Sequence, residues 1–587
     1  MNTRKTFLLL ITFILSGWML VSCGAKPERS RKPSTDWGRG LPIGTDATGT
    51  VGMAIEDDGS MIHAVWPFWT EDGGVGIRYI QLGKAAKINV DHEVVQTLGQ
   101  VRTPRLFIAQ NNTLHLLWAN RSDTASKWQL WYAQIDHDGN ILGELLQVSD
   151  ADSGVLQYAV VEDSSGGILI AWEDVLSGGI NLTAISAIGE KQANLGRVVE
   201  AGRKPDLWVD ERGKIHLAWL DGNNNLFYSR FAIDENLPLS GEKLLYIPIG
   251  TGATLDGPVL GVANGQVYLF WSILNQSGLE AGTARTEYVF FPQGSPAKVS
   301  DIAQVGILPM EEQPYRIASG AYTYSELVPS AYIGLSISSF TYAPTMALHP
   351  SSEMAVILST QQKYRLDDYI QIAVVLMEDG EYKGYTIATK TQAISGDPVV
   401  AIDGAGNFHL IWRDGYTKET VYYTTTNAET RAELDRPTLR DILTLFLAGG
   451  LESLTGILLF PLAFPWMFPG LVLLIIWRLI KNDEDLSNKV SVAILVTSVF
   501  MYQGSKILIF PTMVDYIPFS AWVDIPASWQ LVLRIGVPLL ILGIAIWVSE
   551  WSRKKRQPSS LRYYLVIVIV DTVLTLAIYG VNFLGAY

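Results

Sequence analysis

The segments DERGKIHLAW (210–219) and DGAGNFHLIW (403–412) carry Asp, Gly, His and Trp at the same four positions. In each segment Asp and Gly belong to a short polar turn, where glycine takes a left-handed conformation and aspartate bonds the backbone of the turn. The residues after the glycine alternate along an extended strand, and both of the faces they form are largely apolar. This pattern is typical of a strand whose sheet lies between two others.

The pattern recurs along the first three-quarters of the chain. Related copies end at Trp66, Trp118, Trp172 and Trp271, and a degenerate copy without tryptophan lies around 346–360. From Trp66 through Trp219 to Trp271, successive tryptophans are 52, 54, 47 and 52 residues apart. A unit of this length forms one small sheet that buries its faces only against neighbouring units. The sequence therefore predicts an all-β propeller over residues 47–430, with seven blades preferred and six or eight as alternatives.

These strands resemble the sialidase-like, BNR-type β-propeller superfamily, whose members often read D-x-x-G-x-h-H-h-h-W. The resemblance spans about residues 50–427 and implies the fold. It implies no catalysis, because the strict Asp-box S-x-D-x-G-x-x-W is absent from every copy. A sialidase of this kind would need three convergent arginines, a tyrosine nucleophile with a glutamate partner, and an acidic aspartate. The arginines considered for this role are Arg78, Arg105, Arg203, Arg230, Arg316 and Arg413. We assign no catalytic residue.

The N-terminus predicts export. Residues 1–22 combine a basic start with a short apolar run, as signal peptides do. The sequence LVSC (20–23) resembles the lipobox of bacterial lipoproteins, which implies that Cys23 is lipidated; the alternative is a free cysteine behind an uncleaved signal anchor. Cys23 is the single cysteine, which excludes disulfides and zinc–thiolate sites. The polar, Pro- and Ser-rich residues 23–46 are predicted to be a linker.

Composition excludes several classes of function. A formal charge of −14 argues against nucleic acid as a partner. No HExxH motif, EF-hand loop or glycine-rich phosphate cradle is present, so no cofactor is implied. Four of the seven histidines, at positions 63, 115, 216 and 409, occupy one place in the repeat. Such recurrence predicts packing against the neighbouring blade, and we predict no metal site.

The C-terminal part is predicted to form a transmembrane bundle. Four apolar stretches, 464–480, 490–510, 529–549 and 563–584, are long enough to span a bilayer. The loops after the first and third stretches are basic, whereas 511–528 has no Lys or Arg. By the positive-inside rule the basic loops are cytoplasmic.

The orientation of the bundle decides the role of the apolar segment before it. An exported propeller requires an odd number of crossings before the first basic loop, so we expect 441–462 to be an interfacial or re-entrant helix. The prediction is a four-helix transmembrane region over 464–587. It places the protein in the bacterial cytoplasmic membrane, with the propeller on the outer (extracellular or periplasmic) side.

Four polar residues interrupt the apolar segments, namely Glu452, Lys506, Arg534 and Asp571. Charge in hydrocarbon is costly and often functional. Lys506 and Arg534 are predicted near the outer leaflet, where they either snorkel or pair with Glu452. Asp571 is predicted about a third of the way in from the cytoplasmic side, with no assigned partner.

Three functions are compatible with this organisation. The first is a membrane-anchored propeller that acts as a binding or scaffold module for a glycan, peptide or partner protein. The alternatives are a membrane-tethered sialidase-like glycosidase, and a sensor domain of a small transport or signalling membrane protein. Membrane lipid is a partner in each, and the residues specify no oligomeric state. Ligand contacts are expected from an aromatic insertion with Tyr315, Tyr322, Tyr324, Tyr332 and Tyr342.

Overall fold

A computed structural model of the chain describes residues 29–584, apart from 35, 98, 109–112, 123–125, 164, 233–240, 309–339, 365–366, 416–418, 482–485, 487, 521–524 and 554–558. The predicted signal peptide and Cys23 lie outside the described residues. The described residues belong to two compact units. One comprises 29–363 and 368–436, and the other contains everything from Pro437 onward.

Among the described residues, the first unit forms six antiparallel sheets. Five have four strands, and the sixth has eight. The degenerate repeat copy around 346–360 forms the first two strands of a complete sheet, β22-β23-β24-β25. The strands are β1 Leu41–Ala47, β2 Gly52–Ile55, β3 Ile62–Trp69, β4 Val75–Leu82, β5 Ile88–Thr97, β6 Gln100–Ile108, β7 Leu114–Arg121, β8 Gln129–Ile135, β9 Ile141–Gln147, β10 Val155–Glu162, β11 Ile168–Asp174, β12 Ile180–Ile185, β13 Lys191–Val199, β14 Arg203–Val209, β15 Ile215–Leu220, β16 Asn225–Phe231, β17 Glu242–Tyr246, β18 Ala253–Ala263, β19 Gln266–Asn275, β20 Ala284–Pro292, β21 Ala303–Gln304, β22 Thr341–Leu348, β23 Met354–Tyr364, β24 Asp367–Glu378, β25 Glu381–Ile387, β26 Ser395–Ile402, β27 Phe408–Asp414 and β28 Glu419–Thr425.

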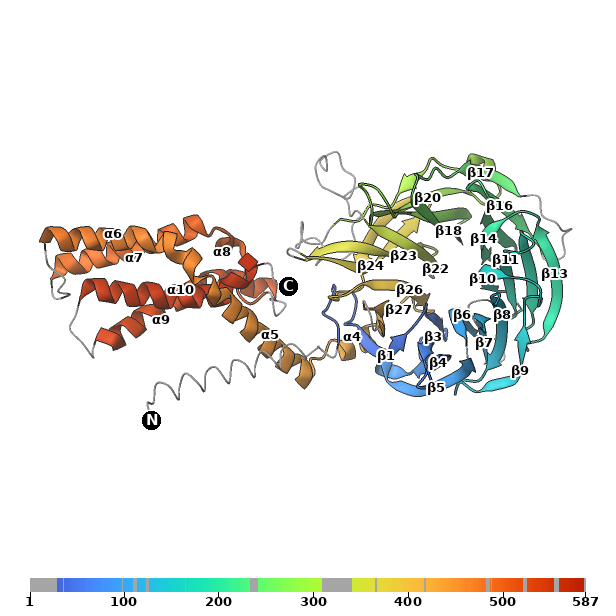
Figure 1. The fold of residues 1–587 in the computed structure, drawn as a ribbon, viewed down its shortest axis with the longest axis horizontal. Helices are drawn as coiled ribbons and strands as arrows, with labels where there is room; N and C mark the ends of the chain where they lie inside the picture. Colours follow the sequence, from blue (N-terminus) through green and yellow to red (C-terminus); the bar gives the residue numbers. More distant parts are fainter. Residues whose placement is uncertain are drawn as a thin grey trace. The chain divides into compact units, whose positions relative to one another are not determined.

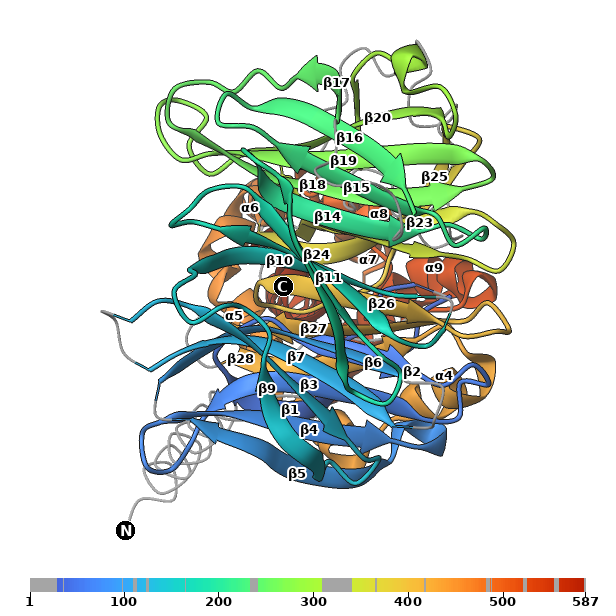
Figure 2. The same ribbon diagram turned by 90° about the vertical axis from the view of Figure 1, so that its right-hand side faces the viewer.

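The sheets are arranged in a ring, which confirms the predicted β-propeller. Figure 1 looks along the axis of the ring, with β5, β9, β13 and β17 at its rim, and Figure 2 shows the same sheets from the side. The innermost strands of neighbouring sheets contact one another, as β10 does with β14 and β14 with β18. We use the word blade for one four-stranded sheet of the ring.

The repeated tryptophans fill the spaces between blades. Trp66, Trp118, Trp172, Trp271 and Trp412 are each at most 2% exposed. The core around Trp118 also contains Ile77 from the preceding blade, and the core around Trp271 contains Leu220 in the same way. Each core is therefore shared by two blades, so a blade buries its faces only in the assembled ring.

The first strand closes the ring, which corrects the predicted linker. Residues 41–46 belong to β1, which pairs with β28 from the other end of the propeller sequence and touches β3 at Ala47. Upstream of β1, Trp37 is 1% exposed. The polar composition of 23–46 concealed this strand, because β1 finds its main partner almost 400 residues away rather than in a local hairpin. The unit also extends past residue 430 into α4 (Ala428–Leu434).

The second unit is helical, and its helices coincide with the predicted apolar stretches. They are α5 Leu439–Leu458, α6 Phe464–Lys481, α7 Lys489–Ile509, α8 Thr512–Asp515, α9 Ala527–Arg553 and α10 Ser560–Leu584. Five of these, all except α8, are long and apolar enough to cross a membrane.

Helix α5 packs closely on α10. A Cβ atom placed on Gly456 would lie 2.2 Å from the carbonyl oxygen of Leu576, and one placed on Gly580 would lie 2.8 Å from the Cα atom of Gly456. Such close approach of two helices needs small residues at the crossing. Toward its N-terminus α5 is less covered, because Leu439 is 84% exposed and Phe446 is 72% exposed. α5 is thus held to the other helices through its C-terminal half.

Candidate functional site at the propeller axis

The innermost strands share a kink that lies outside the repeat motif. Six of them carry a break in register early in the strand, for example between Arg102 and Arg105 on β6 and between Arg203 and Asp206 on β14. In five of the six, the break contains a residue with positive φ followed by proline. The pairs are Thr103-Pro104, Lys204-Pro205, Gly257-Pro258, Ala343-Pro344 and Asp397-Pro398.

A bulge of this kind re-aims the side chains beside it. Proline suits the position because it gives no ladder hydrogen bond, and the preceding residue takes a conformation that most side chains avoid. A signal for the kink was present in the sequence, since each proline lies 13 or 14 residues before the repeat tryptophan or its equivalent.

The bulges link each innermost strand to the next one around the axis. Arg102 of β6 donates to the carbonyl oxygens of Val155 (2.8 Å) and Leu156 (2.6 Å), at the start of β10. In return, the Tyr158 hydroxyl of β10 donates to the Thr103 carbonyl. These contacts fix the relative positions of the side chains that surround the axis.

The same arrangement continues on the following strands. The backbone amide of Lys204 donates to Glu173 (2.9 Å), and its side chain donates to the Leu255 carbonyl of β18. Asp206 accepts from the Leu260 amide at 2.7 Å. This hydrogen bond restricts the Asp206 side chain to one rotamer and so fixes the position of its carboxylate.

Polar side chains from five consecutive innermost strands make up what we call the axial cluster: Arg105, Tyr158, Asp206, Asp256 and Tyr342. Arg105 is exposed, and the other four are half-buried. Arg105 acts electrostatically on both Tyr158 and Asp206, and Asp256 acts on Tyr342. These interactions join a guanidinium, a phenol and a carboxyl in one group, and a carboxyl and a phenol in a second group on the next two innermost strands.

The surroundings of the axial cluster raise the pKa values of three of its acidic groups, Asp206, Tyr158 and Tyr342. Burial raises the pKa of Asp206 to about 6, although the Leu260 amide and Arg105 favour the charged form. Burial likewise raises the pKa of Tyr158 to about 12. The pKa of Tyr342 also rises to about 12, through burial first and the charge of Asp256 second. Near neutral pH the phenols are thus hydrogen-bond donors, and Asp206 changes from donor to acceptor as pH rises through 6.

Of the aromatic insertion proposed for ligand contacts, only Tyr342 belongs to the axial cluster. Tyr315, Tyr322, Tyr324 and Tyr332 lie outside the described residues. Tyr342 is on β22, the innermost strand of its own blade.

The arginines considered for a sialidase triad are distributed over separate partners. Arg316 lies outside the described residues, and Arg105 alone belongs to the axial cluster. The others bond locally, Arg78 with Asp91 (2.6 Å), Arg203 with the Asp221 carbonyl (2.9 Å), Arg230 with Asp210 (2.7 Å), and Arg413 with Asp397 and Glu419.

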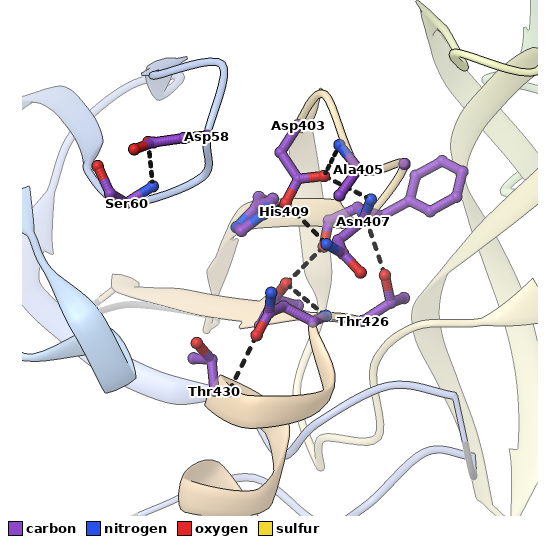
Figure 3. A network of polar contacts seen from close by, with 12 residues as sticks. Asp58, Ser60, Asp403, Ala405, Asn407, His409, Thr426 and Thr430 are labelled. Carbon is purple, nitrogen blue, oxygen red and sulfur yellow. Dashed lines mark hydrogen bonds and ion pairs between the residues drawn. The ribbon is translucent and has the colours of Figure 1, made fainter.

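The repeat histidines are buried, and each contacts a tyrosine of its own blade. Nδ1 of His115, His216 and His409 lies 2.6, 2.7 and 2.9 Å from a tyrosine hydroxyl. Figure 3 shows the turn that precedes His409. In this turn the Asp403 carboxylate accepts hydrogen bonds from the backbone amides of Ala405 and Asn407 and also faces His409. These groups stabilise the turns and the junctions between blades.

The polar residues of the predicted membrane segments are arranged differently from the sequence expectation. Lys506 donates to Asp571 at 2.6 Å and to Thr575 at 3.0 Å, and the Tyr502 hydroxyl donates to the same carboxylate at 2.7 Å. The side chains of Lys506 and Asp571 are 2% and 0% exposed.

This pair supplies the partner that Asp571 lacked, and it corrects the predicted depths. Lys506 was predicted near the outer leaflet and Asp571 about a third of the way in from the cytoplasmic side, but a 2.6 Å contact brings their charged groups to one level. The expected partnership of Glu452 with Lys506 is replaced by this pair. Glu452 is 5% exposed on α5, and Arg534 is half-buried on α9.

No family model matches the chain, and no curated protein matches it in sequence. Solved structures with similar folds include the polysaccharide lyase Uly1 (11% identity, 64% of this chain and 89% of that chain, TM-score 0.40). They also include the NanB sialidase from Streptococcus pneumoniae (9% identity, 70% and 97%, TM-score 0.36) and the BP39L lectin from Burkholderia pseudomallei (12% identity, 62% and 95%, TM-score 0.36). These scores are too low to bear on the activity of this chain, whose fold is established by its own sheets.

Proposed function

We propose that the chain is a membrane-anchored, extracytoplasmic propeller that binds a polar ligand at the axial cluster. It acts as a binding or scaffold module and does not carry out sialidase-type hydrolysis. The observation that carries this proposal is the convergence of Arg105, Tyr158 and Asp206 from three successive strands, held by backbone contacts. The other described arginines that a sialidase would recruit are bonded elsewhere.

The ring in this proposal has seven blades. The eight-stranded sheet reads β26-β27-β28-β1-β3-β4-β5, with β2 on β3, and β1 meets β3 through a single residue pair, Ala47 and Phe68. Dividing the sheet there gives two four-stranded blades, one closed by β1 and one that begins with β2. With the five separate sheets this makes seven.

A glycan is the ligand that the axial cluster fits best. Guanidinium, carboxyl and phenol groups offer alternating donors and acceptors, as the hydroxyls of a sugar require. The tyrosines add apolar ring surface beside those polar groups. An exposed peptide or a loop of a partner protein is the alternative ligand, and the binding experiment below separates the two.

The membrane anchor in this proposal combines lipid on Cys23 with four crossings by α6, α7, α9 and α10. The loops that follow α6 and α9 carry the basic residues expected on the cytoplasmic side. In this arrangement α5 lies in the outer interface of the cytoplasmic membrane. Two observations support this placement of α5. Gly456 contacts the C-terminal part of α10, and the N-terminal half of α5 carries exposed apolar side chains.

Binding is tested on the full chain in mild detergent with an array of bacterial glycans. Arg105→Ala is expected to weaken binding about 10- to 100-fold, because a hydrogen bond to a charged group contributes about 1.5–3 kcal/mol. The matched control is Arg212→Ala, which should leave the affinity unchanged. Arg212 is an exposed arginine in the turn that follows β14 and does not belong to the axial cluster.

The affinity should also depend on pH through Asp206. Its protonated form is complete below about pH 4 and is lost as pH rises through about 6, so wild-type affinity should change across that interval. The Asp206→Asn variant should not show this change, because an amide does not titrate there. Equal affinity of wild type and Arg105→Ala for every glycan bound would contradict an axial glycan site. Binding of a peptide library with the same Arg105 dependence would move the assignment to peptides.

The Lys506–Asp571 pair favours a second candidate, a sensor domain joined to a small transport or signalling bundle. A simple anchor has no need of a buried ion pair, and charged residues at this depth often mark functional sites. Ligand-dependent ion flux in proteoliposomes, lost in Asp571→Asn, would select this candidate over a binding module. Release of sialic acid from a sialoside by the wild type would instead select the glycosidase.

A further inference from the structure

Three of the four repeat histidines use both ring nitrogens. Nε2 of His115 faces the Gly166 carbonyl at 3.2 Å, Nε2 of His216 faces Asp210 at 3.2 Å, and Nε2 of His409 faces Asp403 at 3.4 Å. Each of these partners accepts a hydrogen bond, so Nε2 carries the proton. Nδ1 is then the acceptor for the tyrosine hydroxyl of the same blade.

His63, in the first copy, has the opposite arrangement. The Tyr79 hydroxyl donates its only proton to the His137 carbonyl at 2.8 Å. Nδ1 of His63, which lies 2.8 Å from the same hydroxyl, must therefore donate to it. This tautomer leaves a bare lone pair on Nε2. His63 is 0% exposed, and Nε2 has no hydrogen-bond partner among the described residues.

Two further ligand groups face that lone pair. Oε1 of Glu56 lies 3.9 Å from Nε2 of His63 and 3.6 Å from Nδ1 of His137, and one ligand atom from each of the three residues lies within 4.8 Å of the others. The second oxygen of Glu56 accepts from the Ser60 hydroxyl at 3.0 Å, which orients the carboxylate. Glu56 follows β2, and His137 comes from the turn after β8 in the next blade.

The first copy departs from the others in the features that create this cluster. Its turn is one residue longer, and it carries Glu56 where the copies at 210 and 403 carry aspartate. A lone pair and a carboxylate oxygen that face each other without a proton between them repel, and a cation removes that repulsion.

We propose that Glu56, His63 and His137 bind a divalent cation of the zinc class and thereby join the first blade to the second. Two imidazoles and a carboxylate form a ligand set that Zn²⁺ prefers, at bond lengths of about 2.0–2.2 Å. Tetrahedral ligands at that range are about 3.4 Å apart. The two separations from Glu56, 3.9 and 3.6 Å, therefore need to close by about half an ångström or less, and the two imidazoles, whose ligand atoms lie within 4.8 Å, by up to about 1.4 Å. A fourth position remains for water. Tyr79 supports the site, because it fixes the tautomer of His63.

The experiment uses the full chain in mild detergent, stripped with chelator and dialysed against Zn²⁺ or Co²⁺. Wild type is expected to retain one metal ion per chain by elemental analysis, and Co²⁺ to give the visible bands of a four-coordinate site. His137→Ala and Glu56→Gln should each lower Zn²⁺ affinity by at least about 100-fold, since loss of a ligand exceeds the 10–100-fold effect of losing a supporting contact. Zn²⁺ should raise the melting temperature of wild type and not that of His137→Ala.

The matched control is His216→Gln, which changes the same repeat position in a blade where Nε2 already has a partner. This variant should retain the metal ion. His137 is only partly buried, so its variant tests the site even if His63→Gln does not fold. Metal content in wild type no higher than in His137→Ala would show that water alone occupies the cluster, and would overturn the proposal. Neither outcome depends on whether the axial cluster binds a glycan.

Discussion

The Asp571→Leu variant is expected to lose about 3–5 kcal/mol of unfolding free energy in the helical unit, because Lys506 would remain charged and buried without its counter-ion. Lys506→Met should cost a similar amount, since the carboxylate would then have only the neutral donors of Tyr502, Gln503 and Thr575. The measurement is unfolding in mixed micelles followed by circular dichroism at 222 nm, a signal dominated by the helices.

The double variant decides how the pair acts. Lys506→Met combined with Asp571→Leu should be much more stable than either single variant, because replacing a whole buried pair by apolar side chains is often neutral. Lys489→Met, which removes an exposed lysine from the start of the same helix, should change stability by no more than about 0.5 kcal/mol. Additive losses in the double variant would mean that the two residues do not stabilise each other.

The Gly44→Val variant is expected to destabilise the propeller by about 3 kcal/mol, at the upper end of the usual cost of overpacking a core. A Cβ atom on Gly44 would lie 2.2 Å from the Trp66 ring, which is fully buried between blades. Valine would thus push β1 away from both the ring of Trp66 and its partner strand β28. Thermal unfolding followed by near-ultraviolet circular dichroism measures the loss.

A matched glycine shows whether the cost comes from the closing strand. Gly222→Ala places its Cβ in open space, with no atom within 4 Å, and should leave the melting temperature nearly unchanged. Protease should also cut the Gly44→Val protein near its N-terminus at temperatures where wild type resists. Equal stability of Gly44→Val and wild type would show that β1 does not hold the ring closed.

The repeat predicted most of the propeller because its physical cause is local. The turn residues and the alternation before Trp219 and Trp412 depend on neighbours within about ten positions, and the structure has strands in both places. The helix boundaries were predicted for the same reason, since a long apolar run specifies a helix without reference to its partner. Predicted segment 490–510 and observed α7, for example, differ by one residue at each end.

Features that depend on distant partners were not predictable in this way. β1 is a strand because β28 offers it an edge, and Lys506 meets Asp571 only because of the way α7 packs on α10. The axial cluster depends on the bulges of the innermost strands, which re-aim its side chains. The prolines of these bulges lie outside the motif that revealed the repeat. The shared repeat position of the histidines was also misleading for His63. Its difference from the other three rests on Glu56 in its own turn and on His137, which comes from the next blade.

The most direct test of the account is the side of the membrane on which each unit lies. We expect a membrane-impermeant maleimide to label Asn223→Cys, in an exposed turn of the propeller, on intact cells freed of any outer membrane. It should label Gln557→Cys, in the basic loop between α9 and α10, only after the cytoplasmic membrane is permeabilised. Labelling of Gln557→Cys on intact cells, with Asn223→Cys protected, would contradict an exported propeller held by cytoplasmically looped helices.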